Sequence, residues 1–387
     1  MRIAQVAPLY ERVPPQFYGG TERVVSYLTE ELVRQGHDVT LFASGDSITK
    51  AHLVPINDHS LRLDENSIDR LAHHMVQLEK VFAEIHNFDI VHFHIDYLHF
   101  PLTRRCQEPN VTTLHGRLDI SDLQPLFREY HDMPVVSISN AQREPLPFAN
   151  WVGNVYHGLP VDLLDFHPKA GDYLAFLGRI SPEKRADRAI EIAKRTGIPL
   201  KIAAKVDDAD KKYYEREIKP LLDHPLVEYI GEITEEQKNE FLGNALALLF
   251  PIDWAEPFGL VMIESMACGT PVIAFESGSV SEVLTEGVSG FLCHNLDEAV
   301  AAVGRLPEMD RAKVRAAFEE RFTSTRMASD YVKVYQEVLA QRSQGREVLD
   351  FAELAPVVKG KRTSLKRIQA QETAIIPVDD TSAYLAE

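Results

Sequence analysis

Short apolar runs alternate with amphipathic helical patterns along most of this chain. The apolar runs predict strands in an earlier and a later series: RIAQVA, DVTLFAS, DIVHFHI, NVTTLH and VVSIS, then YLAFLG, PLKIAA, LVEYIG, ALALLF and PVIAF. A helical pattern separates most neighbouring runs, and the first one spans Thr21 to Gln35 with Gly36 as its stop. This rhythm predicts an α/β protein with parallel sheets.

Two sets of about five strands predict two doubly wound, Rossmann-like domains rather than one very wide sheet. The turn-rich stretch from Gly158 to Gly171 marks the boundary between them. The cleft between the domains is then the expected binding site. The expected divisions are a first domain (1–165), a second domain (166–325), a C-terminal helix that crosses back to the first domain (326–344) and an appended tail without the βα rhythm (345–387).

Composition supports a globular protein with room for two cores. The chain has 387 residues, of which 45% are hydrophobic and 26% are charged. Its 58 acidic and 41 basic residues give a formal net charge of −17, which argues against a nucleic-acid partner. The cysteines show no CxxC spacing and are expected as free thiols of a reducing compartment: Cys106, Cys268 and Cys293.

Two further features predict a cytoplasmic location. The start, MRIAQVAPLY, has the pattern of a first strand rather than of a signal peptide. The longest apolar run, Ala245 to Ile252, is far too short to span a bilayer. The tail contains a basic stretch, KGKRTSLKR, with two open interpretations: a solvated segment, or a peripheral contact with an anionic membrane.

The richest motif is DWAEPFGLVMIESMACG, which lies between two predicted strands. It predicts a turn and then a helix whose positive end faces the carboxyl edge of a parallel sheet, where anions bind well. Glu256 is expected before this helix and Glu264 about two turns into it. Acids on both sides of an anion site suit a nucleotide sugar. Ordinary solvated acids are the alternative, but Glu264 has apolar neighbours and needs a partner or a ligand.

Two other segments place phosphate-binding groups at strand-to-helix junctions. Gly19 and Gly20 precede the first helix, where backbone can approach a phosphate closely; a flexible loop is the alternative. In GRISPEKR, Arg179 follows a strand and Lys184 comes five residues later, with Ser181 as the expected N-cap of the next helix. These two cations can clamp a diphosphate, although a solvated basic face remains open.

His115 follows the strand NVTTL and can hydrogen-bond a sugar hydroxyl from the sheet edge. His92 and His94 lie on one face of a strand, but no convincing further ligands lie near them, so no metal site is expected. The chain has no GxSxG elbow, no phosphate-binding GxxxxGK[ST] loop and no GxGxxG fingerprint. An α/β-hydrolase and a P-loop kinase are therefore disfavoured.

Taken in their order along the chain, the motifs resemble those of the retaining glycosyltransferases of family 4. This is the glycogen-synthase and mannosyltransferase-like group with the two-domain GT-B fold. The matching segments cover about residues 1–340: YGGTERVV, the HG of TLHGR, GRISPEK, and EPFGLVMIE followed by ACGTPVIAF and GVSGFL. One departure is VYHGLPVD, because His157 stands where the family usually has an asparagine.

The resemblance implies that a UDP- or GDP-sugar binds mainly to the second domain. Arg179 and Lys184 are implied to hold the diphosphate, and Glu264 the ribose. The residues implied to contact the donor are Gly19, Gly20, Arg179, Lys184, Gly231, Glu256, Phe258, Gly259, Leu260 and Glu264. The residues implied to take part in the transfer are His115, Glu256, Arg179 and Lys184.

The implied reaction is a retaining, metal-independent transfer of a hexosyl group to an acceptor hydroxyl by front-side attack, without a bound cofactor. The acceptor has no readable code and is a lipid, a glycan or a small metabolite. Two alternatives remain: a non-catalytic nucleotide-sugar-binding protein, and a GT-B epimerase or phosphorylase. The presence of both Glu256 and His115 argues against the binding protein, and no clear pyridoxal lysine motif supports the phosphorylase.

Overall fold

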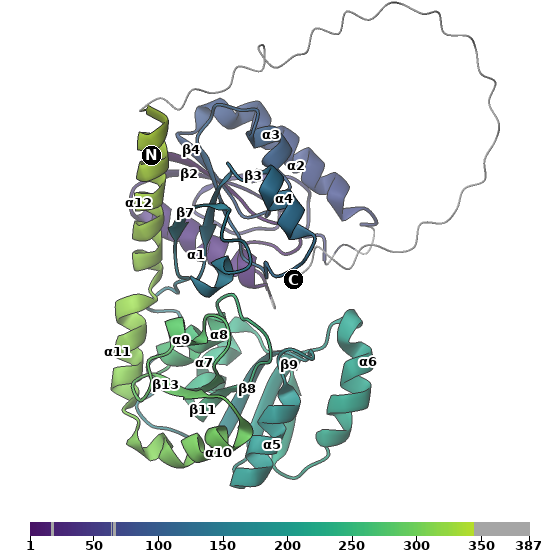
Figure 1. The fold of residues 1–387 in the computed structure, drawn as a ribbon, viewed down its shortest axis with the longest axis vertical. Helices are drawn as coiled ribbons and strands as arrows, with labels where there is room; N and C mark the ends of the chain where they lie inside the picture. The colour runs from purple at the N-terminus through teal and green to yellow at the C-terminus, as the bar shows by residue number, and fades with distance from the viewer. Residues whose placement is uncertain (17–18, 63, 65–66, 344–387) are drawn as a thin grey trace, which may run out of the picture.

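The computed structural model describes residues 1–343, apart from 17–18, 63 and 65–66, and contains two parallel sheets stacked end to end with helices around them (Figure 1). The first sheet contains β1 (Arg2–Val6), β2 (Asp38–Ala43), β3 (His52–Pro55), β4 (Ile90–Phe93), β5 (Asn110–Thr113), β6 (Pro134–Ser137) and β7 (Asn150–Asn154). The second contains β8 (Tyr173–Arg179), β9 (Leu200–Lys205), β10 (Val227–Gly231), β11 (Ala245–Phe250), β12 (Val272–Phe275) and β13 (Gly290–Cys293).

Helices connect most of these strands. Those of the first half are α1 (Gly20–Arg34), α2 (Arg70–Glu84), α3 (Phe100–Thr103) and α4 (Leu123–Glu129). Those of the second half are α5 (Ala186–Thr196), α6 (Lys211–Tyr213), α7 (Glu235–Gly243), α8 (Leu260–Ala267), α9 (Val280–Val283), α10 (Leu296–Arg305), α11 (Arg311–Arg321) and α12 (Ser324–Ser343). The two doubly wound sheets confirm the α/β architecture that the alternating pattern predicts.

The strand count of about five per sheet is wrong, because the sheets have seven and six strands. All ten strands predicted from apolar runs are present, and the three additional ones are β3, β7 and β13. Each of these three lies at the edge of its sheet. An edge strand pairs on one side only, and β3 and β7 are no more than half-buried, so their sequences carry a weak hydrophobic pattern. The strand β13 is mostly buried and apolar and was missed all the same.

The strand order places equivalent crevices in both halves. The first sheet runs β3-β2-β1-β4-β5-β6-β7, and the second runs β10-β9-β8-β11-β12-β13. The order therefore reverses between β1 and β4 and again between β8 and β11. In open parallel sheets, ligands bind beyond the carboxyl ends of the strands at such a reversal. The loops after these four strands are the ones expected to form a site.

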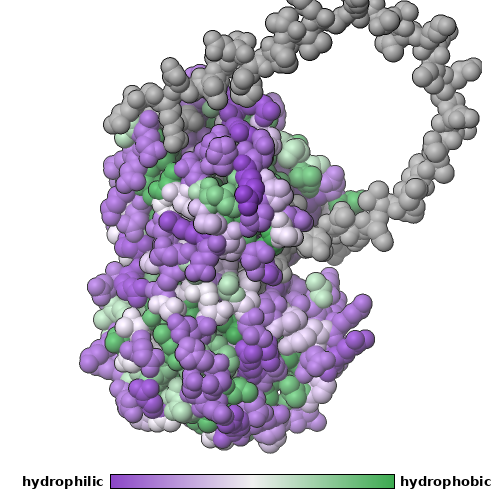
Figure 2. Space-filling view, in the orientation of Figure 1, coloured by the Kyte–Doolittle hydropathy of each residue, from purple (hydrophilic) through white to green (hydrophobic). Residues whose placement is uncertain are grey.

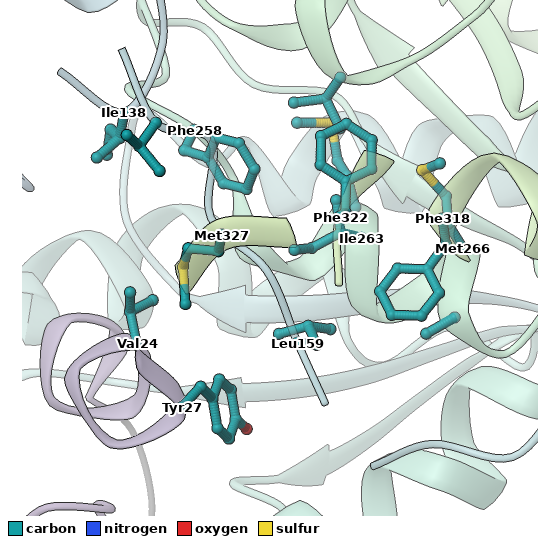
Figure 3. Close-up of a cluster of buried hydrophobic side chains, with 14 of the residues drawn as sticks. Val24, Tyr27, Ile138, Leu159, Phe258, Ile263, Met266, Phe318, Phe322 and Met327 are labelled. Atoms are coloured by element: carbon teal, nitrogen blue, oxygen red, sulfur yellow. The ribbon is translucent and has the colours of Figure 1, made fainter. Parts of the chain in front are cut away.

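One hydrophobic cluster joins the two halves behind the cleft (Figure 3). Val24 and Tyr27 come from α1, Ile263 and Met266 come from α8, and Phe322 precedes α12. All five side chains are buried. The cluster therefore connects α1 with α8, the two helices that begin at the cleft, through side chains such as Leu159 and Met327.

The helix α12 lies along the first half of the molecule (Figure 1) and packs against α1, β5 and β7. Just before it, Thr323 pairs with Leu159, so the two segments that run between the halves lie side by side. Tyr335 of α12 is fully buried and hydrogen-bonds Gln5 of β1. The last segment of the described chain thus contributes to the core of the first sheet.

The visible face of the molecule is mostly hydrophilic, with small separate hydrophobic areas (Figure 2). None of the helices described in residues 1–343 is long and apolar enough to cross a membrane. The expectations for the tail, including its basic stretch, fall outside the described residues.

Candidate active site

A cavity of about 360 Å³ lies between the two halves. Loops after β1 and β4 line it from the first sheet, and loops after β8 and β11 line it from the second. The predicted residues that line it are Gly19, Gly20, His115, Arg179, Lys184, Glu256, Phe258, Gly259, Leu260 and Glu264. Gly231 does not: it ends β10 with φ +85°, and the next two residues, Glu232 and Ile233, line the cavity instead.

The GRISPEK segment leaves β8 at Arg179 and forms a turn before α5. The expected helix start at Ser181 is wrong, because α5 begins at Ala186 and is preceded by Arg185 in the left-handed conformation, with φ 55°. The Ser181 hydroxyl donates instead to Glu183 at 2.7 Å. This turn brings the side chains of Arg179 and Lys184 into the same cavity.

Carboxylates surround Arg179. Its guanidinium donates to Glu183 at 2.6 Å, and it lies 3.7 Å from Asp207 and 3.6 Å from Asp210. The Arg179 side chain is only 14% exposed. A diphosphate at this place would compete with these carboxylates for the guanidinium.

Lys184 is paired with Glu256, the carboxylate expected to contact the donor sugar. Lys184 Nζ lies 2.5 Å from Glu256 Oε2, and the indole Nε1 of Trp254 donates to the same oxygen at 2.9 Å. The ammonium also lies 4.8 Å from the centre of the Trp254 ring, a cation–π distance. The lysine can therefore exchange its carboxylate partner for a phosphate while the ring still supports its stem.

Two helices begin at the cavity and point their positive ends into it. The helix α8 starts at Leu260 after Gly259, whose φ of +78° favours glycine over residues with a side chain. A Cβ placed on Gly20, the first residue of α1, would lie 3.7 Å from the Leu260 side chain. The two helix starts therefore converge at one place, which favours an anion there.

Glu264 lies about one turn into α8, not two, because the helix begins at Leu260 rather than directly after Glu256. Its carboxylate is 2.7 Å from Lys238 Nζ on α7, and Lys238 also lies 3.1 Å from Glu235. Arg23 of α1 pairs with Glu235 across the cleft. A chain of alternating charges thus connects the first half of the molecule to Glu264.

His115 belongs to a buried hydrogen-bonded chain that leads to α12. Its Nε2 lies 2.9 Å from Nδ1 of His94, and His94 Nε2 lies 2.8 Å from the side-chain oxygen of Gln5. The Gln5 amide donates to Tyr335 Oη at 3.1 Å, and that hydroxyl lies 2.7 Å from Nδ1 of His92. The pair His92 and His94 therefore serves this chain of hydrogen bonds.

The donors and acceptors in this chain allow one assignment of protons. The Gln5 oxygen can only accept, so His94 carries its proton on Nε2 and accepts on Nδ1. His115 must then donate from Nε2, which leaves its Nδ1 as an acceptor without a bond to any described residue. Burial lowers the pKa of His115 to about 3, so its ring is neutral. Its free lone pair can accept a hydrogen bond from a hydroxyl.

His157, the departure from the family pattern, packs directly on this histidine. The rings of His115 and His157 are stacked, with centroids 5.4 Å apart and an interplanar angle of 16°. His157 also makes an edge-to-face contact with Phe258, with ring centroids 4.8 Å apart. An aromatic ring at this position therefore covers one face of His115.

Lys238 and Asp96 line the cavity without any motif that singles them out in the sequence. Arg23 lines it too and was missed, although it stands in the motif YGGTERVV. Trp254 was missed as well, although it stands two residues before Glu256 in the richest motif. Within residues 1–343, as far as they are described, no group of three or more His, Cys, Asp or Glu side chains could hold a metal ion.

Comparison with known families accounts for most of the chain. Residues 18–152 match the family described as Glycosyltransferase Family 4. Residues 166–322 match the family described as Glycosyl transferases group 1. The two matches follow one another along the chain and correspond to the two sheets.

Individual relatives are distant but nearly full-length. The phosphatidyl-myo-inositol mannosyltransferase of Mycolicibacterium smegmatis is 26% identical over 357 residues, 83% of this chain and 88% of its own. The N-acetyl-alpha-D-glucosaminyl L-malate synthase of Bacillus anthracis is 24% identical and covers 85% of this chain and 96% of its own. Anabaena HepE, solved in complex with UDP and glucose, has a TM-score of 0.69 at 16% identity, covering 87% of this chain and 100% of its own.

Proposed function

We propose that this chain, a GT-B glycosyltransferase with a family 4 domain followed by a group 1 domain, moves a hexosyl group from a UDP- or GDP-sugar to an acceptor hydroxyl with retention of configuration. The observation that carries the proposal is the composition of one cavity. It brings together two cations, two helix starts and two carboxylates from distant parts of the chain.

Each of these groups suits one part of the donor. Arg179, Lys184 and the converging starts of α1 and α8 suit the diphosphate, since they supply positive charge and backbone donors. Glu256 stands before α8 and suits the hydroxyls of the sugar. Glu264 lies within α8 and suits the ribose. Binding of the donor would move Lys184 from the Glu256 carboxylate to a phosphate, and this would release Glu256 for the sugar.

In the proposed reaction the acceptor hydroxyl approaches the anomeric carbon from the side of the leaving group. The new carbon–oxygen bond forms as the bond from the anomeric carbon to the diphosphate breaks. The departing phosphate oxygen takes the hydroxyl proton. The clamp and the helix starts stabilise the negative charge that develops on the diphosphate, so positioning and electrostatics supply the catalysis.

His115 would orient the sugar through the lone pair on its Nδ1, which can accept a hydrogen bond from one sugar hydroxyl. A neutral ring is suited to this task, because an imidazolium would offer a proton and would repel positive charge at the anomeric carbon. The proposal needs no metal, since the clamp already supplies the positive charge that a divalent cation would bring.

Donor binding and transfer are tested in two steps. UDP, GDP and ADP are first screened by thermal shift, where a ligand at 100 times its Kd stabilises the folded state by about 2.7 kcal/mol. The corresponding sugars are then supplied with candidate acceptors, and the anomeric configuration of the product is read by NMR. Absence of any nucleoside diphosphate binding would refute the proposal, and an inverted product would refute the retaining mechanism. Binding without transfer to any acceptor would favour the sugar-binding protein.

A further inference from the structure

The first-domain wall of the cleft contains a carboxylate that has no role in donor binding. Asp96 stands in the loop after β4, two residues beyond His94, and lines the same cavity as His115. Its backbone is left-handed, with φ 49°, a conformation that aspartate tolerates better than most residues but that few adopt. The fold thus holds this side chain at the sheet edge despite some backbone strain.

Asp96 has no partner among the residues that the structure describes: no hydrogen bond and no ion pair involves its side chain. Burial raises the pKa of its carboxyl group to about 6. A partly buried carboxylate without a partner lowers the stability of the folded protein. Such groups occur preferentially at sites where a ligand supplies the missing hydrogen bond.

The neighbouring polar groups also accept hydrogen bonds. Burial raises the pKa of the Tyr10 hydroxyl, while the charge of Arg70 lowers it and the charge of Asp96 raises it. Tyr10 and Asp96 both line the cavity. The Tyr10 ring lies 5.4 Å from the ring of His74, which also lines the cavity. His74 Nδ1 lies 2.9 Å from the carbonyl oxygen of Arg70, so Nδ1 carries the proton and Nε2 is an acceptor.

Each cation on this wall, in contrast, already has a carboxylate partner. Arg62 pairs with Glu11 at 3.1 Å, and Arg117 pairs with Asp119 at 2.7 Å. Arg23 pairs with Glu235 of the second half. Arg70 does not line the cavity, and its guanidinium lies 5.9 Å from the centre of the Tyr10 ring. Among the described residues of the cavity lining, a ligand that enters beside Asp96 therefore meets hydrogen-bond acceptors and no unpaired cation. Ligand groups that donate hydrogen bonds, such as hydroxyls, fit this wall, and a negatively charged carboxylate does not.

We propose that Asp96 and His74 form the acceptor subsite and bind adjacent hydroxyls of an uncharged polyol, so that this chain glycosylates a sugar or cyclitol ring rather than a carboxylic acid. The inference rests on the proposed function and narrows it. The names of two relatives contain one example of each class: phosphatidyl-myo-inositol, a cyclitol, and L-malate, a carboxylic acid. The unpaired carboxylate selects the polyol, because like charges repel in a partly buried site.

The test measures acceptor binding to the full chain saturated with UDP or GDP, whichever raises its melting temperature. Saturation-transfer NMR at pH 8 compares myo-inositol and methyl α-D-glucopyranoside with L-malate. Asp96→Asn keeps the size of the side chain and removes its charge. Asp58→Asn is the matched control, because Asp58 is exposed in the first domain and does not line the cavity.

We expect at least one neutral polyol to bind the wild type more tightly than malate. Asp96→Asn should weaken that binding at least tenfold and change UDP or GDP affinity less than twofold, and the control should change neither. The proposal is overturned if malate binds more tightly, if no neutral polyol binds, or if Asp96→Asn binds the polyol normally. Failure of UDP, GDP and ADP to bind would instead refute the proposed function.

A second readout does not depend on the choice of polyol. Asp96→Asn should raise the melting temperature at pH 8, since it removes an unpaired charge. This gain should shrink as the pH falls below about 6 and vanish below about 4, where the carboxyl is protonated in both the folded and the unfolded chain. A melting temperature that falls at pH 8 would show that Asp96 has a structural partner and would overturn the subsite.

Flotation with phosphatidylcholine vesicles, with and without phosphatidylinositol, separates a lipid-linked polyol from a free one.

Discussion

Replacing Glu256 by glutamine separates sugar binding from diphosphate binding. The Glu256 carboxylate holds Lys184 at 2.5 Å and accepts a hydrogen bond from the Trp254 indole at 2.9 Å. Glutamine keeps the size of the side chain and can still accept from the indole. It no longer attracts the ammonium, which becomes free to meet a phosphate.

The expected effects on binding and on rate therefore differ. Lys184 in Glu256→Gln need not leave a carboxylate, so UDP and GDP should bind as tightly as to the wild type or more tightly. The gain should be about 1 kcal/mol or more, roughly fivefold, because the pair is largely buried, with 17% and 9% of the two side chains exposed, and a phosphate would satisfy the ammonium that has lost its carboxylate. In contrast, kcat/KM should fall about a hundredfold, or ~2.7 kcal/mol, because the carboxylate no longer favours positive charge at the anomeric carbon.

Calorimetry with UDP and GDP measures the first effect, and steady-state release of the nucleoside diphosphate measures the second. The double variant with Lys184→Ala completes a cycle, and the coupling between the two substitutions should be visible in diphosphate affinity. Glu217→Gln is a suitable control, because Glu217 is exposed in the second domain and outside the cavity. Equal losses of binding and rate in Glu256→Gln would refute the division of roles.

Four further outcomes are expected. Arg179→Ala and Lys184→Ala should each weaken UDP or GDP binding by roughly 1.5–3 kcal/mol in calorimetry, and unchanged affinity in both would refute the clamp. Glu264→Gln should weaken nucleoside diphosphate binding itself, because its proposed partner is the ribose; an effect on rate alone would contradict this. Dialysis against EDTA should leave turnover intact, and activity that returns only with Mg²⁺ or Mn²⁺ would contradict metal independence. Burial lowers the pKa of His115 to about 3, so between pH 6.5 and pH 3 the unfolded chain binds a proton here that the folded chain does not, and the free energy of unfolding should fall as the pH drops below about 6.5. Burial also lowers the pKa of His94, so the melting temperature of a His94→Gln variant should fall less steeply with decreasing pH than that of the wild type.

Much of the fold, and the meeting of Arg179, Lys184 and Glu256 in one cavity, followed from sequence alone. Strand and helix patterns are local, so the ten apolar runs predicted ten strands in their true places. The motifs GRISPEK and EPFG stand at strand ends, and parallel strands bring such ends to one edge. For this reason the local pattern is sufficient to assign Arg179, Lys184 and Glu256 to one site.

Local patterns were insufficient where local signals compete or are weak. The Ser181 hydroxyl could cap a helix or bond to Glu183, and the turn adopted the second arrangement, which delayed α5 to Ala186. Gly231 was expected to contact the donor from the family resemblance, but it does not line the cavity, whereas the next two residues, Glu232 and Ile233, do. The three missed strands lie at sheet edges, and partial burial leaves little pattern in two of them, β3 and β7.

Only the tertiary structure decided which polar groups have partners. Lys184 meets Glu256 across 72 residues, and Gln5 meets Tyr335 across 330 residues. The second contact exists because α12 returns to the first sheet, and it determines which nitrogen of His115 is free. The same packing leaves Asp96 without a partner among the described residues of the first-domain wall of the cleft. Sequence determines which charges are present, but their pairing depends on long-range packing, and the proposed acceptor subsite rests on the one carboxylate that this packing leaves unpaired.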